Sequence, residues 1–316
     1  MLEPQRVREA ADRLAGLVHH TPLVGSTLLG QSIGVRLHLK CECLQKTGSF
    51  KARGALNKVL TLAEEERKSG LITVSAGNHA QAVAWAARQV GASCAVVMPI
   101  GAPRSKIDAV EGYGAEVVLH PERATLFDRL HQERDDRGAV FIHPFDDPAV
   151  LAGAGTVGSE IVEDLPDVDA VFVPVGGGGL LGGVSTIIKD TRPETRVIGV
   201  ELEAGPGMKP ALEAGKPIPV ARPETLADGM TPPFVGALPL AIARESVDEL
   251  VGVSEAEIRS TMGLLMTRCK YVVEASGAAA TAAVLHRKVD MPAQSRVVAV
   301  ISGGNLDLEQ IAEIVT

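Results

Sequence analysis

The strongest constraint on the fold is a regular alternation of short, β-branched apolar segments with longer amphipathic ones. Such alternation is the pattern of α/β proteins. Several of the short segments are apolar throughout, as expected for parallel strands that helices cover on both faces. The expected strands are residues 36–41, 71–75, 94–98, 116–119, 139–142, 170–175, 196–201, 249–253 and 296–302. The sequence therefore predicts an α/β fold with mostly parallel strands.

Helical periodicity between these strands, together with a proline- and glycine-rich region, completes the expected organisation. The expected helices include residues 77–91, 103–113, 122–137, 254–268 and 276–288. Residues 204–236 contain AGPGMKP, GKPIPVARPE and DGMTPPF, which predicts a loop-rich excursion. The chain stops soon after its last strand and helix, so we expect no appended regulatory domain.

Charge and composition restrict the classes of partner. The 316 residues carry a formal net charge of −8, which argues against broad contact with nucleic-acid phosphates. One Trp, two Tyr and six Phe are too few to build stacking platforms for bases. The longest uncharged run, residues 170–188, is interrupted by glycines and Pro174 and is unsuited to a bilayer. We expect a small-molecule substrate, with no nucleic acid and no membrane as partner.

The cysteines and the N-terminal residues predict a cytoplasmic location. Cys41, Cys43, Cys94 and Cys269 lack the C-x-x-C spacing of zinc and redox sites, so we expect buried thiols in a reducing compartment. Residues 1–18 mix both charge signs at helical spacing. They show no apolar stretch followed by a small-residue cleavage site, so no export signal is expected.

Four expected strands are followed by segments rich in glycine, serine, asparagine and lysine. Ligands of open parallel sheets bind at the carboxyl ends of strands, and small residues let the backbone approach a ligand closely. We therefore expect these four segments to converge on one site. They are QKTGSFKARG (45–54), SAGNH (75–79), GGGG (176–179) and SGGN (302–305).

The glycines from Gly176 to Gly179 lie between an expected strand and an expected helix that begins near Leu180. Exposed amides and the helix dipole make such a position an anion site, suited to a phosphate. No Gly-Lys-Ser/Thr follows, so nucleoside triphosphate hydrolysis lacks its usual lysine and magnesium ligand. The alternative is that these glycines serve only tight packing.

Lys51 lies among small residues at the expected first turn of a helix. A partly desolvated lysine near a helix N-terminus loses proton affinity and becomes a usable amine nucleophile. The alternative is an ordinary solvated lysine on a helix surface. One such lysine together with a phosphate-binding loop favours pyridoxal phosphate as the cofactor.

Six ordered motifs spread over the whole chain resemble one enzyme family. They are ECLQKTGSFKARGALN, VSAGNHAQAVA, HPFDDPAVLAGAGT, VPVGGGGLLGG, ETLADG and ISGGN. Together they resemble the threonine/serine dehydratases, which are fold type II pyridoxal phosphate enzymes and are related to serine racemase. The chain is most similar to a short catabolic-type threonine dehydratase. The resemblance implies two open, twisted, mostly parallel sheets with helices on both faces. It also implies a large domain of residues 1–66 and 147–316 and a small domain of residues 67–146.

The resemblance assigns roles to individual residues. It implies that Lys51 forms the Schiff base and then acts as the catalytic base. The implied cofactor-binding residues are Phe50, Lys51, Asn78, Gly176, Gly177, Gly178, Gly179, Glu274 and Ser302. Asn78 would meet the pyridine 3′-oxygen, and Ser302 the pyridine nitrogen. The implied substrate-binding residues are Ser75, Ala76, Gly77, Asn78 and His79.

The implied activity is β-elimination from a hydroxy amino acid, L-threonine or L-serine, which yields a 2-oxo acid and ammonia. A serine hydroxyl at the ring nitrogen cannot hold that nitrogen protonated as a carboxylate would, so elimination is favoured over long-lived carbanion chemistry. The resemblance also favours a homodimer or a dimer of dimers.

Two departures from the family pattern bear on the reaction. Ala76 stands where serine racemase has a second serine that acts on the opposite face of Cα, so racemisation should be poor. Gly207 stands where metal-binding relatives have an acidic residue, which leaves Glu201 as a weak candidate for a metal ligand. Serine racemase and 3-hydroxyaspartate dehydratase remain alternatives within the group. Cysteine synthase-like enzymes are disfavoured, because their asparagine turn reads N-T-G.

Several single motifs and residues admit other interpretations. Residues 153–158 match G-x-G-x-x-G but follow an expected helix start instead of a strand, which disfavours a dinucleotide site. A non-catalytic binding protein on the same scaffold is a distant alternative. His79 is interpreted as a positioning or packing residue, and His143 as a loop-stabilising one. For Glu274, a capping role for the following helix is the alternative to cofactor contact.

Overall fold

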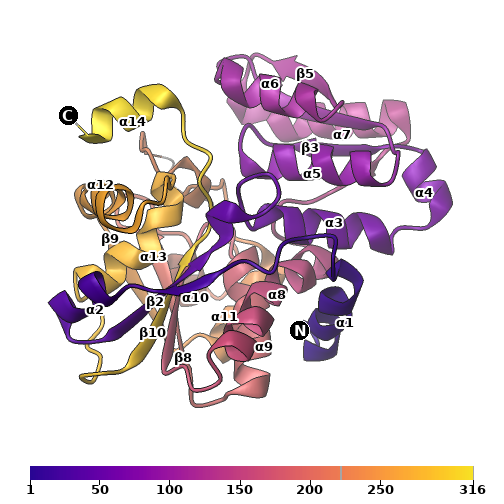
Figure 1. The fold of residues 1–316 in the computed structure, drawn as a ribbon. Coiled ribbons are helices and arrows are strands. Elements are labelled where there is room, and N and C mark those ends of the chain that lie inside the picture. The colour runs from indigo at the N-terminus through magenta and orange to yellow at the C-terminus, as the bar shows by residue number, and fades with distance from the viewer. Residues whose placement is uncertain (221–222, 316) are drawn as a thin grey trace.

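The computed structural model describes residues 1–220 and 223–315 and confirms an α/β fold with two mostly parallel sheets (Figure 1). The larger sheet has six strands in the order β1-β2-β10-β7-β8-β9. All neighbours pair in parallel except β1 and β2. The strands are β1 (Leu23–Gly25), β2 (Arg36–Cys41), β7 (Ala170–Pro174), β8 (Arg196–Leu202), β9 (Glu249–Val253) and β10 (Arg296–Ile301).

The smaller sheet has four parallel strands in the order β5-β4-β3-β6. Its strands are β3 (Leu71–Val74), β4 (Cys94–Pro99), β5 (Glu116–His120) and β6 (Val140–Phe141). With α5 (Asn78–Gln89), α6 (Arg104–Gly112) and α7 (Leu126–Arg137) it forms the purple lobe at the upper right of Figure 1. The division into residues 1–66 with 147–316 and residues 67–146 stays a prediction.

Side chains of the central strands alternate between two cores, which confirms that helices cover both faces. In β7, Ala170 and Phe172 enter one hydrophobic cluster, whereas Val171 and Val173 enter another. In β4, Val96 and Met98 face one cluster while Ala95 and Val97 face the other. This explains why these strands lack polar alternation in the sequence.

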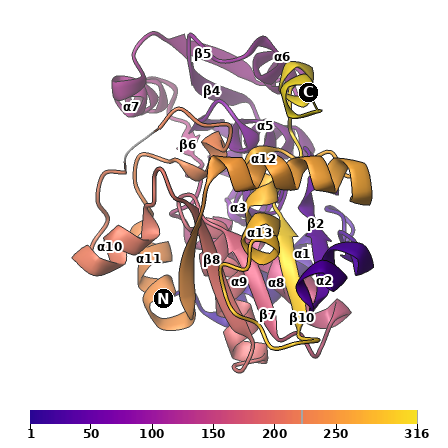
Figure 2. The same cartoon turned by 90° about the vertical axis from the view of Figure 1, so that its left-hand side faces the viewer.

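Three helices cover one face of the large sheet. They are α8 (Pro148–Asp164), α9 (Gly179–Thr191) and α11 (Ala237–Ser246). Helix α1 (Pro4–Leu14) packs on two of them, α8 and α9, and α3 (Lys51–Thr61) packs on α8. Figure 2 shows α12 (Glu255–Leu264) and α13 (Ala275–Leu285) over the other face. The remaining helices are α2 (Thr27–Ile33), α4 (Glu64–Lys68), α10 (Met208–Ala214) and α14 (Leu308–Val315).

The structure corrects several local expectations. The sequence did not predict the antiparallel strand β1, because its three residues show no readable period. Residues 265–269 continue α12 as a π-helix. The excursion at residues 204–236 contains the short helix α10, and its residues 221–222 lie outside the described residues. Cys41 and Cys94 are buried free thiols, but Cys43 and Cys269 are only half-buried.

The G-x-G-x-x-G match at residues 153–158 lies inside helix α8, which confirms that it is no dinucleotide fingerprint. Its glycines allow helices to touch. A Cβ on Gly153 would lie 2.5 Å from the Arg53 carbonyl oxygen, and one on Gly155 would lie 2.7 Å from that of Gly183. Throughout the described chain, no helix has the length and apolar character needed to cross a bilayer.

Candidate active site

Two of the four predicted segments lie side by side at the carboxyl ends of β2 and β10. The amide of Phe50 donates to the Ser302 carbonyl at 3.0 Å, and Gly304 donates to the Gly48 carbonyl at 2.9 Å. Ser49 and Gly303 form an isolated antiparallel bridge. These bonds hold the turn before Lys51 against the end of β10, so Lys51 begins α3 beside Ser302.

A chain of side-chain amides brings the third segment to the same place. Asn305 Nδ2 donates to Asn78 Oδ1 at 2.7 Å and to the Thr47 carbonyl at 2.8 Å. Asn78 Nδ2 in turn donates to Glu274 Oε1 at 2.6 Å. Asn78 is the first residue of α5 and belongs to the small-sheet lobe, so this chain links the two sheets. Asn305 lies in one of the quoted motifs, but the sequence analysis assigned it no role.

The fourth segment, Gly176–Gly179, reaches Lys51 through the loop after β6. Lys51 Nζ donates to the Pro144 carbonyl at 2.8 Å. The next residue, Phe145, packs its ring on Gly177. The predicted convergence of the four segments is therefore confirmed, three of them by direct hydrogen bonds and the fourth through Pro144 and Phe145.

Close packing explains in part why residues 176–179 are glycines, which is the alternative that the sequence analysis left open. A Cβ on Gly177 would overlap the Phe145 ring, and one on Gly176 would lie 2.6 Å from the Gly229 carbonyl oxygen. Gly178 has φ +89° and abuts Met208 and Pro239. Gly178 is also the N-cap of α9 and gives no side-chain cap, so the first amides of this helix have no intrahelical acceptor.

A matched pair of substitutions tests this packing. Gly177→Ala should lower the free energy of unfolding by about 1–3 kcal/mol, because the new methyl displaces Phe145. Gly182→Ala should be tolerated, since a Cβ there meets Leu151 at an ordinary 3.4 Å. Urea unfolding of both variants measures the difference. Equal midpoints would show that Phe145 yields freely and that packing does not require a glycine at 177.

Burial shifts the proton affinities of three side chains at this site. It lowers the pKa of Lys51 to about 8. It lowers the pKa of His79 to about 3, with the nearby Lys51 charge acting in the same direction. Burial raises the pKa of Glu274 to about 7, partly opposed by the hydrogen bond from Asn78. The amine of Lys51 is therefore a base that works near neutral pH.

The structure bears on the interpretations of Glu274, His79 and His143. Glu274 occupies the N-cap position of α13, but its side chain makes no capping bond and accepts from Asn78 instead, so the side-chain capping interpretation is wrong. His79 Nε2 lies 3.0 Å from the Ile142 carbonyl oxygen, a contact that a positioning residue would make, and its role stays a prediction. His143 Nδ1 accepts from the Phe145 and Asp146 amides, which confirms a loop-stabilising role.

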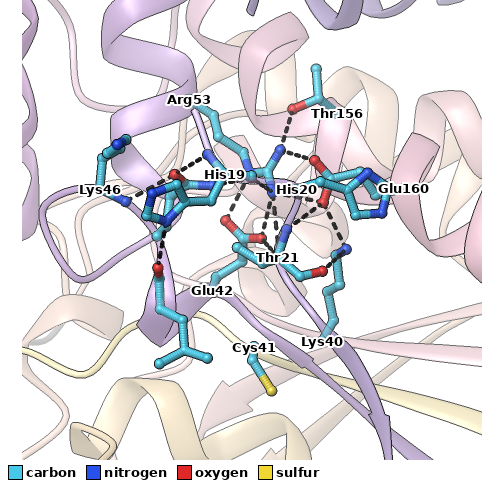
Figure 3. Close-up of polar contacts among 12 residues, drawn as sticks. His19, His20, Thr21, Lys40, Cys41, Glu42, Lys46, Arg53, Thr156 and Glu160 are labelled. Atoms are coloured by element: carbon cyan, nitrogen blue, oxygen red, sulfur yellow. Dashed lines mark hydrogen bonds and ion pairs between the residues drawn. The ribbon is translucent and has the colours of Figure 1, made fainter. Parts of the chain in front are cut away.

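A buried ionic cluster beneath the first turn of α3 was not predicted from the sequence (Figure 3). Arg53 donates to Glu42 at 2.7 and 2.8 Å and to Glu160 at 2.5 and 2.8 Å. Lys40 Nζ lies 2.7 Å from Glu160 Oε2. Arg53, Lys40 and Glu42 are all fully buried. Two sequence features could have indicated this cluster. Arg53 lies among small residues in KARGALN, and the charged residues of K-C-E stand at the end of an apolar strand.

Glu201 caps a helix, which accounts for both of its carboxylate oxygens. Oε1 accepts from the amides of Gly207 and Met208 at 2.7 and 2.6 Å, and Oε2 from that of Lys209 at 3.0 Å. Within residues 1–220 and 223–315, no group of three or more His, Cys, Asp or Glu side chains is arranged to hold a metal ion.

Comparison with known proteins identifies the family of this chain. Residues 14–303 match the family model described as "Pyridoxal-phosphate dependent enzyme". The chain belongs to this family. Its cofactor is pyridoxal phosphate.

Relatives of this pyridoxal-phosphate dependent enzyme match over most of both chains. The L-threonine ammonia-lyase of Thermotoga maritima is 46% identical over all of this chain and 78% of its own. The catabolic L-threonine dehydratase of Escherichia coli K12 is 44% identical over 97% of this chain and 94% of its own.

Two solved structures are similar to this enzyme along nearly their whole length. The threonine deaminase of T.th. has a TM-score of 0.90 and 43% identity, and the match covers 97% of this chain and 99% of that one. Maize serine racemase has a TM-score of 0.94 and 35% identity, and the match covers 98% and 96%. The backbone is therefore similar to that of a threonine deaminase and to that of a serine racemase. The sequence is more similar to the three threonine enzymes named here, at 43–46% identity, than to maize serine racemase at 35%.

The residues present fit pyridoxal phosphate. The Lys51 amine is suited to a carbonyl, and the uncapped start of α9 is suited to a phosphate. Three buried polar atoms, Thr47 Oγ1, Ser49 Oγ and His79 Nδ1, have no hydrogen-bond partner among the residues that the structure describes. Thr47 and Ser49 lie in the loop that precedes Lys51, and unsatisfied buried polar groups there are compatible with a polar ligand. Four other such atoms lie elsewhere in the described chain, in Ser159, Arg192, Thr261 and Thr281. Ser302 Oγ is buried and donates only a long bond, 3.3 Å, to the Ser276 carbonyl.

Proposed function

We propose that this enzyme deaminates a hydroxy amino acid, L-threonine or L-serine, by β-elimination to a 2-oxo acid and ammonia. The observation that carries the proposal is the half-buried Lys51, whose pKa burial lowers and whose Nζ donates to the Pro144 carbonyl. The loop before Lys51 is tied to Asn78 through Asn305, and Phe145, next to Pro144, packs on Gly177. The names of the relatives at 46% and 44% identity support threonine as the substrate. We also propose a cytoplasmic enzyme that works as a homodimer or a dimer of dimers, as the family resemblance implies.

The proposed mechanism assigns one task to each group. When bound, pyridoxal phosphate supplies a carbonyl for amines and a ring that accepts the electron pair from Cα. Gly176–Gly179, at the start of α9, would bind the phosphate, Asn78 and Ser302 would orient the ring, and Phe50 and Glu274 would line it. The first amides of α5, within the turn Ser75–His79, bind the substrate carboxylate.

Lys51 moves the proton. Its Nζ, a base near neutral pH, takes the Cα proton. The β-hydroxyl group leaves as water with a second proton, which the cofactor phosphate would supply. The released enamine is then hydrolysed in water to the 2-oxo acid and ammonia. The Pro144 carbonyl, 2.8 Å from Nζ, accepts a hydrogen bond from the ammonium that results.

The competing activity is racemisation, which a single substitution tests. Ala76 carries no exchangeable proton, so a donor on the far face of Cα is missing at this position. Ala76→Ser should raise racemisation of L-serine relative to dehydration, with a ceiling of about 10²–10⁴-fold for a well-positioned general acid. Chiral chromatography of the incubated amino acid measures the ratio. Abundant D-serine from the unmodified enzyme would show that racemisation does not need a hydroxyl at position 76.

A substrate panel tests the proposed function directly. The purified holoenzyme is incubated with L-threonine, L-serine and 3-hydroxyaspartate, and 2-oxo acid and ammonia are quantified in parallel. Equal amounts of both products from L-threonine or L-serine support the proposal. Product from 3-hydroxyaspartate alone would instead establish the alternative dehydratase. A pyridoxal-containing protein that forms no product from any of the three would contradict dehydration.

A further inference from the structure

The loop after β6 is anchored on both sides of Pro144, whose carbonyl accepts a hydrogen bond from Lys51. Upstream, the Ile142 carbonyl accepts from Thr73 Oγ1 at 2.9 Å and lies 3.0 Å from His79 Nε2. Downstream, the Asp146 carboxylate caps α11 by accepting from the amides of residues 237 and 238 at 3.0 and 2.9 Å. Pro144 lies between these anchors, so its carbonyl direction depends on the residues next to it.

His143 is the side chain that closes the turn around Pro144. Its Nδ1 accepts from the amide of Phe145 at 3.2 Å and from that of Asp146 at 2.9 Å. An atom that accepts two N–H groups must carry a lone pair, so His143 is protonated at Nε2 only. Its ring also contacts the rings of Phe141 and Phe145 edge-on, at centroid distances of 5.4 and 4.8 Å.

We propose that His143 is a positioning residue that aims the Pro144 carbonyl at the Lys51 amine and thereby holds that amine, and the proton it carries, in one place. That this positioning matters for catalysis rests on the proposed role of Lys51 as the base. The hydrogen bonds that link His143, Pro144 and Lys51 do not depend on that role. His143 does not reach the reacting atoms itself. It acts through two backbone amides and one carbonyl, within a turn that Phe145 also presses onto Gly177.

The charges around His143 agree with a neutral ring. Burial lowers the pKa of His143, and the charge of Lys51 acts in the same direction, while Asp146 and Asp147 oppose both. His79, whose own pKa is lowered, is the other titratable group that faces it. The folded pKa of His143 is depressed, so the Nδ1 bonds persist at neutral pH and are lost only when acid protonates the ring.

The proton affinity of Lys51 is the quantity that tests this proposal. Full-length protein freed of its cofactor is pulsed with acetic anhydride at a series of pH values, and acetylation of the Lys51 peptide is quantified by mass spectrometry. The unmodified protein should titrate near pH 8. His143→Leu should lower the apparent pKa of Lys51 by about one unit, because the ammonium loses a fixed carbonyl acceptor.

Matched variants separate positioning from general damage. His143→Asn places an amide oxygen near the Nδ1 position, and it should restore the Lys51 titration of the unmodified protein. His131→Leu removes an exposed imidazole that packs on the other side of Phe141, and it should change nothing. In His143→Gln the amide acceptor is displaced by one methylene, so this variant should lower the Lys51 pKa as His143→Leu does. It takes the place of His143→Leu if the leucine variant does not fold.

Each outcome decides the inference. A Lys51 pKa in His143→Leu or His143→Gln that is unchanged or raised overturns it, as does a shift in His143→Asn as large as in His143→Leu. If the Lys51 pKa moves as expected but the reduced cofactor label is found on another lysine, the positioning role stands and the proposed function fails. The two claims can therefore fail separately.

Discussion

Lys51→Ala is expected to lower kcat for the proposed dehydration by at least about 10⁴-fold. Loss of a positioned general base alone costs about 10²–10⁴-fold. The same change removes the amine that the cofactor carbonyl needs, so two losses combine. Steady-state assays of 2-oxo acid formation at saturating cofactor measure the effect.

The control for this prediction is Lys68→Ala on α4. Lys68 is 70% exposed and, among the described residues, forms an ion pair with Glu64 alone, so kcat should not change. With the cofactor removed from all three proteins, thermal unfolding of both variants should match that of the unmodified protein, because the Lys51 amine makes one hydrogen bond and no ion pair among the described residues. Activity in Lys51→Ala within tenfold of the unmodified enzyme would show that another residue moves the Cα proton.

Arg53→Met is expected to lower the free energy of unfolding by about 3–5 kcal/mol. The guanidinium is fully buried and satisfies Glu42, which is also fully buried, together with most of Glu160. Methionine fills a similar volume but leaves these carboxylates without their main partner. Because Arg53 lies in the first turn of α3, close to Lys51, cofactor affinity should fall as well. Urea unfolding and cofactor titration measure the two effects.

A surface arginine provides the comparison for Arg53. Arg137 pairs with Glu116 and Glu133 but is 34% exposed, so Arg137→Met should lower the free energy of unfolding by about 0–1 kcal/mol.

The pH dependence of the cost of Arg53→Met provides a second check. Burial would raise the pKa of Glu160, but Arg53 and Lys40 outweigh it and hold this pKa below its ordinary 4.5. The stabilisation is therefore present above pH 4.5 and is lost as pH falls through the lowered pKa, so the cost of Arg53→Met should shrink in acid. A cost that grows in acid would contradict this assignment.

The fold was predictable from the sequence because its strands are buried on both faces. Every strand longer than three residues coincided with a predicted segment, and the central strands β3, β4 and β7 are buried at every position. Edge strands such as β5, which contains Glu116 and His120, are partly exposed. The strand β1 was not predictable, because an edge strand of three residues is specified by its partner β2 and by no pattern of its own.

The candidate site was predictable only where its residues carry recognisable types and spacing. Lys51 and the tetraglycine were found because strand ends concentrate small residues there. The packing of Phe145 on Gly177 and the contacts of Asn305 join residues more than 30 positions apart in the chain. Such pairs depend on the tertiary fold, and no periodicity records them. The ion cluster of Arg53 was missed because single charged residues usually belong to the surface.

Reduction of the holoenzyme with borohydride, followed by proteolysis and mass spectrometry, tests the central claim most directly. Borohydride fixes the cofactor to whichever amine holds its carbonyl carbon. We predict a single pyridoxyl label on the peptide that contains Lys51, accompanied by loss of the visible absorption band. A label on a different lysine, or a colourless protein with no label at all, would contradict the assignment of Lys51.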